Sequence, residues 1–508
     1  MSLSDALSIA SGGLANINRQ LAVVSQNVSN AGTPGYAREV ATQSSVTAAG
    51  DPLGVSIGLV TRSVDVQAQG LVLNQNAAVS GLQTRQAALQ SIDALQGTPG
   101  QGNDLPSLVG TLENAFSTLL SDPSNQAQQS QVVQAAHGVA AQVNALSAGI
   151  GNARQAAQDG LVTGVAALNA GLAQIGTLSD QIVRLQSGGR STADLENQRD
   201  VAMMAVSQLV DVKFLAQSNG DMLAVTSSGL QLPLHADRPP FATSGATLAA
   251  TTSYPGGGIP AITLHGVDVT GQLSGGQLGA SITLRDKTLP TYQGALDEFA
   301  EGLSNRFAQQ GLILFSDSTG TVPVIGGPPA QSGYVGYAGT MQVNPAVTAA
   351  PSLVRDGTTS IGGNPSGASA FSLNPAGGPV GFTTLIDRVL SFTFGAEAQP
   401  GVGQLAMQTS GLGPAGTLSA PFVAPTTLEA FAAATVASQA SDSADATSDL
   451  KSQQAVQTAL KTQAAVGSTV SIDQEMSNMV QLQNSYGANA KVMTAVQSMW
   501  SQLLAAVP

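Results

Sequence analysis

The chain has 508 residues, of which 43% are hydrophobic, only 4% are aromatic and 10% are charged, and it contains no cysteine. This composition is too apolar for a disordered chain and too poor in charge for a typical cytosolic enzyme. The net charge of −13, with no run of Lys or Arg, argues against nucleic-acid binding. The absence of cysteine excludes disulfides, thiolate metal sites and cysteine nucleophiles.

The N-terminal segment lacks the features of a cleavable secretory signal. Its first basic residue is Arg19, and no continuous apolar core follows the start. No run of about 18 apolar residues occurs along the chain, so we expect no membrane insertion. If the protein leaves the cell, it is expected to do so without a cleaved signal peptide.

Apolar residues at both ends of the chain follow a heptad pattern, which is typical of helices that pair through a narrow seam. The N-terminal seam consists of Leu3, Leu7, Ala10, Leu14, Ile17, Leu21, Val24 and Val28. The C-terminal seam consists of Met479, Leu482, Tyr486, Asn489, Met493, Val496, Trp500, Leu503 and Val507. We predict that the two helices pair with each other and form an assembly interface. The alternative is two ordinary amphipathic helices on a globular core.

Helical spacing continues through most of residues 65–210. The stretch SDPSN ends one helix, and Asp122 and Pro123 are expected to begin the next. After Val212 the pattern alternates with a period of two, and Asn219-Gly220 predicts a β-hairpin. Gly, Pro, Ser and Thr dominate residues 312–425, which we predict to form a peripheral β domain.

These patterns predict an α+β multidomain protein with a terminal α-helical coiled coil, a long-helix bundle and β-rich inserted domains. The expected domains are an N-terminal axial helix (1–35) paired with a C-terminal one (468–508), a helical bundle (36–211) completed by 285–311 and 427–467, a small β-rich domain (212–284) and an outer β-rich domain (312–426).

The segment SQNVSNAGTPGYAR predicts a decisive end to the first helix. Asn30 and Gly32 are expected to adopt the left-handed conformation that terminates helices, and Pro-Gly favours a tight turn. Tyr36 would then supply a large, rigid contact between subunits. The alternative is an ordinary helix end and turn. The candidate residues of this turn motif are Asn27, Asn30, Thr33, Pro34, Gly35, Tyr36 and Arg38.

No motif in the sequence predicts catalysis, a cofactor or a metal. The GGGIP stretch lacks the lysine and the following helix of a phosphate loop, and the three histidines are isolated from one another. Four charged residues cluster on one helical segment, where we predict ion pairing or capping. They are Asp194, Glu196, Arg199 and Asp200.

Several stretches resemble bacterial flagellar axial proteins. NVSNAGTPGYAR is similar to the segment after the first helix of that family, and SIDQEMSNMVQLQNSYGANAKVMTAVQSMWSQLL is similar to its closing helix. Within the family, three internal stretches resemble hook-associated protein 1. They are LLSDPSN, DLENQRDVAMMAVSQLVDV and GGQLGASITLRDKTLPTYQGALDEFAEGLSNRF.

The resemblance implies a structural protein at the junction of hook and filament, exported through the flagellar type III apparatus and acting outside the cell. It implies four partners: further copies of the chain, hook protein, the second junction protein and an export chaperone on the C-terminal helix. The alternatives are another axial protein (hook, rod or flagellin-like), a secreted coiled-coil adhesin or type III translocator, and a cytosolic enzyme with helical extensions.

Overall fold

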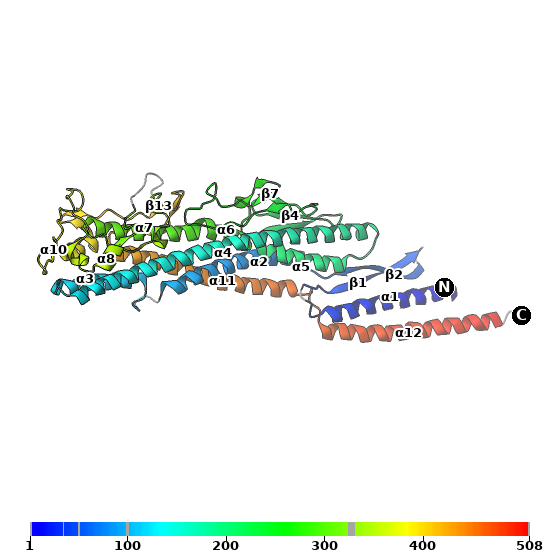
Figure 1. Ribbon diagram of the computed structural model, residues 1–508. Coiled ribbons are helices and arrows are strands. Elements are labelled where there is room, and N and C mark those ends of the chain that lie inside the picture. Colours follow the sequence, from blue (N-terminus) through cyan, green and yellow to red (C-terminus); the bar gives the residue numbers. More distant parts are fainter. Residues whose placement is uncertain (1–2, 34, 49–50, 98–100, 324–330, 506–508) are drawn as a thin grey trace.

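The computed structural model describes residues 3–33, 35–48, 51–97, 101–323 and 331–505. The molecule is elongated: a body of long helices continues into a slender tail, and both chain ends lie at the far end of that tail (Figure 1). Long helices combine with small antiparallel sheets, so the predicted α+β multidomain class is confirmed.

Helix α4 (Gln126–Ser187) runs the length of the body and is 62 residues long, or about 93 Å at 1.5 Å per residue. Its N-cap is Asn125, whose side chain accepts hydrogen bonds from two backbone N–H groups. The prediction that Asp122 caps this helix was wrong, because Asp122 instead follows the last turn of α3 (Leu105–Ser121). Four residues (122–125) separate the two helices, so Asn125 directly precedes α4, whereas Asp122 and Pro123 lie too early to begin it.

Helices α2 (Val66–Gln96), α3, α7 (Leu289–Gln309) and α11 (Leu428–Ala465) pack with the first half of α4 around one apolar core. Phe307 lies at its centre, with ring centroids 5.7 Å from Phe315 and Phe394 and 5.8 Å from Phe116. Part of α4 is long and apolar enough to cross a membrane by length and composition alone, but packing in the helical body accounts for that character.

A second core lies against the other half of α4. Helices α5 (Ala193–Leu209) and α6 (Gly276–Thr283) pack there with a three-stranded sheet, β3 (Val212–Ala216), β4 (Met222–Thr226) and β5 (Gln231–Leu232). The Asn219-Gly220 turn joins β3 to β4, and Gly220 has a φ of 90°. A smaller sheet follows, with β6 (Phe241–Ala242), β7 (Thr263–Leu264) and β8 (Val267–Asp268).

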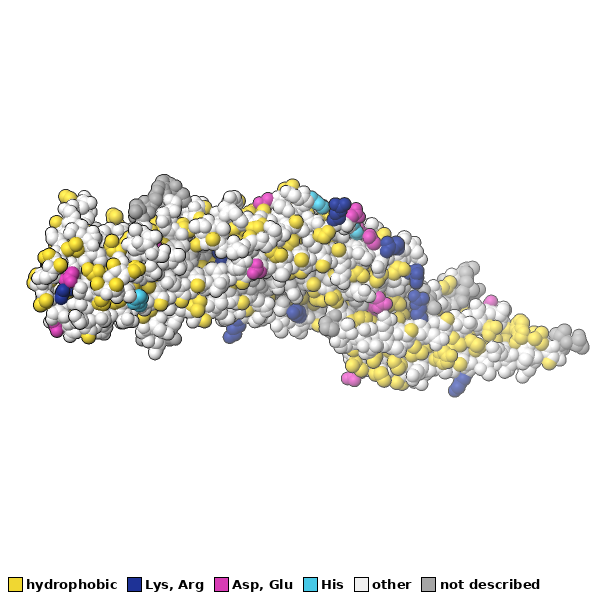
Figure 2. Space-filling model, viewed as in Figure 1, with side chains coloured by type: hydrophobic (Ala, Val, Ile, Leu, Met, Phe, Trp, Pro, Cys, Tyr) yellow, Lys and Arg dark blue, Asp and Glu magenta, His cyan; other side chains and the backbone are white. Residues whose placement is uncertain are grey.

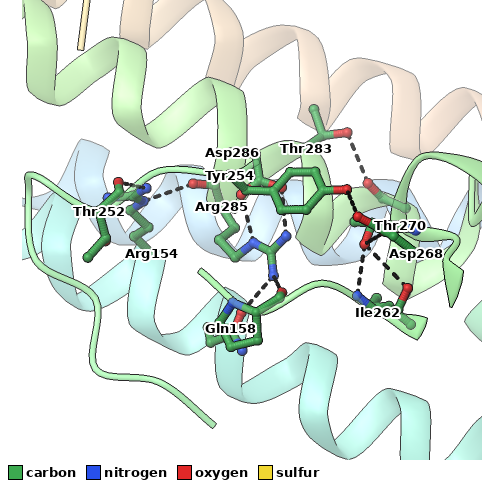
Figure 3. A network of polar contacts seen from close by, with 12 residues as sticks. Arg154, Gln158, Thr252, Tyr254, Ile262, Asp268, Thr270, Thr283, Arg285 and Asp286 are labelled. Atoms are coloured by element: carbon green, nitrogen blue, oxygen red, sulfur yellow. Dashed lines mark hydrogen bonds and ion pairs between the residues drawn. The ribbon is translucent and has the colours of Figure 1, made fainter. Parts of the chain in front are cut away.

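Two buried arginines fix the segment before β7 to the bundle (Figure 3). Arg154 of α4 donates to the carbonyl oxygens of Ala249, Thr252 and Arg285 at 2.8–3.1 Å. Arg285, in the π-helical turn between α6 and α7, binds both carboxylate oxygens of Asp286 and the side chain of Gln158. These bonds satisfy two guanidinium groups that would otherwise be costly to bury.

The segment 312–426 differs from the predicted peripheral β-rich domain. Its strands are two or three residues long: β9 (Phe315–Ser316), β10 (Gln342–Val343), β11 (Glu397–Gln399), β12 (Val402–Gly403), β13 (Ser410–Leu412) and β14 (Leu418–Ser419). Short helices α8 (Pro345–Ala349), α9 (Leu353–Asp356) and α10 (Thr384–Arg388) lie between them. Apolar side chains such as Phe315, Met341 and Ile386 belong to the same core as α4, so the segment completes the bundle.

The tail consists of α1 (Leu3–Asn30), α12 (Ile472–Ala505) and the hairpin β1 (Glu39–Ala48)–β2 (Asp51–Arg62). Helices α1 and α12 run antiparallel, and the hairpin lies on the other side of α1 (Figure 1). The prediction that residues 36–211 form a helical bundle was therefore wrong for 39–62. The alternating stretch GVSIGLVT (54–61) lies in β2, so it belongs to a hairpin of the tail.

We expect Phe307→Ala to lower the free energy of unfolding of the body by about 3–5 kcal/mol, because it empties the centre of the larger core. Urea denaturation followed by circular dichroism measures this change. Leu405→Ala is the matched control, since Leu405 is 82% exposed and its loss should change stability by less than about 0.5 kcal/mol. Equal effects of the two substitutions would contradict the shared core.

Candidate functional site

The predicted seam residues lie on α1 and α12. Ile17, Val24 and Val496 are buried, whereas Trp500 and Leu503 remain 47% and 56% exposed. Ala10 is also buried, and Val507 lies outside the described residues. The other seam residues are partly exposed: Leu3, Leu7, Leu14, Leu21, Val28, Met479, Leu482, Tyr486, Asn489 and Met493. Asn489 lies beside Gly13, where an added Cβ would be 3.4 Å from the amide nitrogen. Whether the seam forms an assembly interface remains a prediction.

Helix α12 leaves most of its apolar side chains uncovered. Of its 34 residues, only Glu475 and Val496 are buried, and Figure 2 shows apolar side chains spread along the tail. Those at least 40% exposed include Ile472, Met476, Val480, Val492, Met499 and Leu504. An exposed apolar surface of this length is typical of a helix that packs against another surface.

The turn after α1 places its left-handed residue later than predicted. Gly35 has a φ of +80°, whereas Asn30 and Gly32 are not left-handed. The backbone N–H of Thr33 binds the carbonyl of Asn30, and that of Tyr36 binds the carbonyl of Thr33, so two successive turns close the segment. Pro34 lies outside the described residues. A Cβ on Gly35 would lie 2.6 Å from Val201 of α5. The turn therefore needs glycine there, both because of its positive φ and because α5 approaches so closely.

Asn27 connects the end of α1 to the start of β1. Its amide nitrogen donates to the backbone carbonyl of Glu39, while its amide oxygen accepts from the backbone N–H of Glu39 and the hydroxyl of Tyr36. Burial raises the pKa of Tyr36, and the negative charge of Glu39 adds to this shift. Tyr36 therefore has a contact within its own chain, and its contact with other subunits remains a prediction.

Arg38 connects the turn to the start of α12. Its Nε lies 2.6 Å from Oε1 of Glu475, whose side chain is fully buried. The backbone N–H of Arg38 donates to the carbonyl of Ser468, and its own carbonyl accepts from Ser63. Segments 437 residues apart in sequence thus meet at one arginine.

The tail meets the body at a polar joint, which we define as Glu39, Arg62, Asp194, Glu196, Asn197 and Asp200 together with their hydrogen bonds. Arg62, at the end of β2, binds Glu196 at 2.8 Å and Asp200 at 2.5 Å. Asn197 accepts from the backbone N–H of Ala37 and donates to Glu39 at 3.2 Å. Asp194 accepts from Gln26 of α1.

Glu39 is the buried carboxyl group of the joint. Burial raises its pKa to about 7, the nearby charge of Asp194 adds to the shift, and the guanidinium of Arg62 opposes it. The sequence had predicted ion pairing for the cluster of Asp194, Glu196, Arg199 and Asp200. Of these, Arg199 points elsewhere and donates to Ser179 and Gly220 inside the body.

Sequence reasoning missed four residues of this region, namely Glu39, Arg62, Asn197 and Glu475. Each of the four has a partner 134 or more residues away in the sequence, so no local spacing could have shown them. Among the described residues, no group of three or more His, Asp or Glu side chains could hold a metal ion. The hydrogen bonds and ion pairs of Arg62, Asn197 and Glu39 connect the tail to the body.

Two family models match separate parts of the chain. Residues 89–314 match the family described as flagellar hook-associated protein FlgK helical domain, and residues 462–506 match the flagellar basal body rod FlgEFG protein C-terminal family. The first match covers much of the body, and the second covers all of α12. Both descriptions name flagellar proteins.

Among curated proteins the chain is similar to flagellar hook-associated protein 1 of several bacteria. It is 25% identical to that of Salmonella typhimurium over 61% of this chain and 56% of the relative, and 25% identical to that of Bacillus subtilis over 41% and 43%. The matched part of the chain thus spans 56% of the first relative's length and 43% of the second's. The predicted resemblance to hook-associated protein 1 is confirmed.

One solved structure, the flagellar hook junction protein FlgK from Burkholderia pseudomallei, is 22% identical to this chain. It aligns with a TM-score of 0.40 over 51% of this chain and 47% of that one.

We expect Gly35→Ala to weaken the packing of this turn against α5. The left-handed conformation costs an alanine about 1–2 kcal/mol, and the alanine methyl group would clash with Val201. Hydrogen exchange of residues 33–40 should rise. Gly32→Ala is the matched control, since Gly32 has no positive φ and open space around its Cβ position. Unchanged exchange in the Gly35 variant would contradict this role of the turn.

The joint should also weaken as the pH rises. The folded pKa of Glu39, about 7, lies above its ordinary value of 4.5, so the folded chain binds this proton more tightly than the unfolded chain does. Its contribution to stability is complete below about pH 4.5 and is lost as the pH rises through about 7. Amide exchange at residues 36–40, corrected for intrinsic rates, should accelerate over that interval. In Glu39→Gln this pH dependence should disappear.

Proposed function

We propose that this protein is a structural component of the bacterial flagellum, located at the junction between hook and filament and assembled through α1 and α12. One observation carries the proposal: the match to the axial C-terminal family, residues 462–506, falls on the helix that leaves nearly all its apolar side chains uncovered. The helical-domain match and the relatives named hook-associated protein 1 support the location.

The partners we propose follow from this location. They are further copies of the chain in a ring or helical assembly, hook protein, the second junction protein and an export chaperone that covers the C-terminal helix before export. The exposed apolar residues of α12 support a chaperone, since such a surface aggregates unless it is covered. We further propose that the chain is exported to the cell exterior without a cleaved signal peptide.

The family is structural, and we propose that the chain is not an enzyme. Among the described residues, the strongly shifted carboxyl groups Glu39, Asp297 and Glu301 owe their raised pKa values chiefly to burial. Asp297 is hydrogen-bonded to the backbone of Gly336 and Ala338. These bonds give it a structural role.

Immunogold labelling of intact bacterial appendages tests the proposal. We expect label at one position per flagellum, between hook and filament. Label along the whole filament or along the hook would favour another axial protein, and label on the cell surface away from flagella would favour an adhesin. Turnover of a substrate by the purified monomer would favour the alternative that the chain is a cytosolic enzyme with helical extensions.

We also expect both chain ends to be disordered in the free monomer and to become ordered only on assembly. In α4, 23 residues are buried, whereas α12 buries two, and a helix with so little tertiary packing is marginal by itself. Hydrogen exchange of the purified monomer should show residues 1–30 and 475–508 unprotected and the helices of 65–210 protected. Strong protection of both ends in a verified monomer would contradict assembly-coupled order.

A further inference from the structure

Residues 233–240 form a strap that connects the two small sheets beside the second half of α4. The strap joins β5 to β6, and three of its eight residues are prolines. Among the described residues, one backbone–backbone hydrogen bond involves it, from the N–H of His265 to the carbonyl oxygen of Pro240. Its position on α4 therefore depends on side-chain contacts.

The strap is fixed to α4 at both of its ends. At its start Leu234 is buried, and a Cβ on Gly176 of α4 would clash with the carbonyl oxygen of Leu234. Just beyond its end, the side chain of Asn169 binds the backbone N–H and the carbonyl of Phe241 at 3.0 and 2.8 Å. A pocket of about 490 Å³ lies between the strap and α4. The contacts at the two ends therefore decide whether the strap stays closed over this pocket.

His235, at the start of the strap, faces two carboxylates that come from different elements. Its Nδ1 lies 3.4 Å from Oδ1 of Asp180 on α4, and its Nε2 lies 3.1 Å from Oδ1 of Asp221 in the β3–β4 turn. The backbone N–H of Met222 also donates to Oδ1 of Asp221 at 2.7 Å, which holds this carboxylate in place. The imidazole thus bridges α4 and the hairpin.

Only the charged imidazole can satisfy both contacts. A neutral imidazole carries one N–H, so its other nitrogen would present a lone pair to a carboxylate oxygen, whereas imidazolium donates from both nitrogens. Aspartates as a class are ionised throughout the range in which histidines titrate, about pH 5–8. The two carboxylates lie at opposite nitrogens of the ring, so they cannot share one metal ion with it. The arrangement therefore favours a proton.

The other charged groups around His235 keep their charge over this range of pH, because arginines and aspartates do not titrate there. Arg199 donates to the carbonyl of Gly220, next to Asp221, and Arg184 lies one helical turn beyond Asp180 on α4. On the strap itself, Asp237 and Arg238 carry opposite charges. The imidazole is thus the group whose charge changes.

We propose that His235 is a pH-sensitive clip, which holds the start of the strap on α4 while the imidazole is charged and releases it on deprotonation. The contact of Asn169 with Phe241 at the other end involves no charged group, so it persists when the clip opens. The strap therefore opens from its start, above the pocket. This inference goes beyond the proposed function and does not depend on it.

Spin labelling tests the clip, because the natural chain contains no cysteine. Ala236→Cys in the full-length chain carries the label, and its electron paramagnetic resonance spectrum reports the mobility of the strap. Each exposed ion pair changes a local equilibrium by about 1.4- to 5-fold. We therefore expect the ratio of mobile to immobile label to rise by about 2- to 25-fold between about pH 5.5 and pH 8. A label at Ala167→Cys, exposed on α4, is the control and should show no change.

Three further substitutions in the labelled chain identify the titrating group. His235→Gln keeps a polar side chain without the charge and should abolish the pH dependence, and Asp221→Asn should reduce it. Glu39→Gln removes the carboxyl group of the joint, whose pKa of about 7 falls in the same range, and should leave the strap's response unchanged. A label whose mobility does not change with pH, or an unchanged pH dependence in His235→Gln, would overturn the proposal. Neither result bears on the position of the chain in the flagellum.

Discussion

The burial of one apolar stripe along α4 holds the body together. This helix contributes to both cores: residues up to Ala157 belong to the larger core and residues from Leu161 onward to the smaller one. The boundary between them is polar, because Arg154 and Gln158 bind the network around Arg285 there. A single continuous helix thus aligns two cores that would otherwise be independent units, which makes the body long and stiff along one axis.

The tail is joined to that body by a different kind of interaction. Apolar burial is non-directional, whereas the contacts of Arg62, Asn197 and Glu39 depend on donor–acceptor geometry and charge. The joint therefore fixes the direction in which the tail leaves the body. It does so with groups whose protonation and pairing respond to pH and salt.

The sequence predicted those parts of the fold in which neighbouring residues carry the signal. The long helices follow from 3.6-residue spacing, and the β3–β4 hairpin follows from Asn219-Gly220. The segment 312–426 was misjudged because its apolar residues come in short irregular runs. Residues such as Phe315 and Ile386 join the α4 core only through tertiary contacts. The polar joint could not be predicted from the sequence for the same reason, because Glu39 and Asn197 lie 158 positions apart.

The contrast between body and tail bears on how such a chain can be both stable and associative. Two apolar cores bury side chains of the body's long helices, and its buried Arg154 and Arg285 have hydrogen-bond partners. In the tail, by contrast, α12 buries only Glu475 and Val496. Apolar surface alone would drive association without fixing how neighbours align, because burial tolerates sliding.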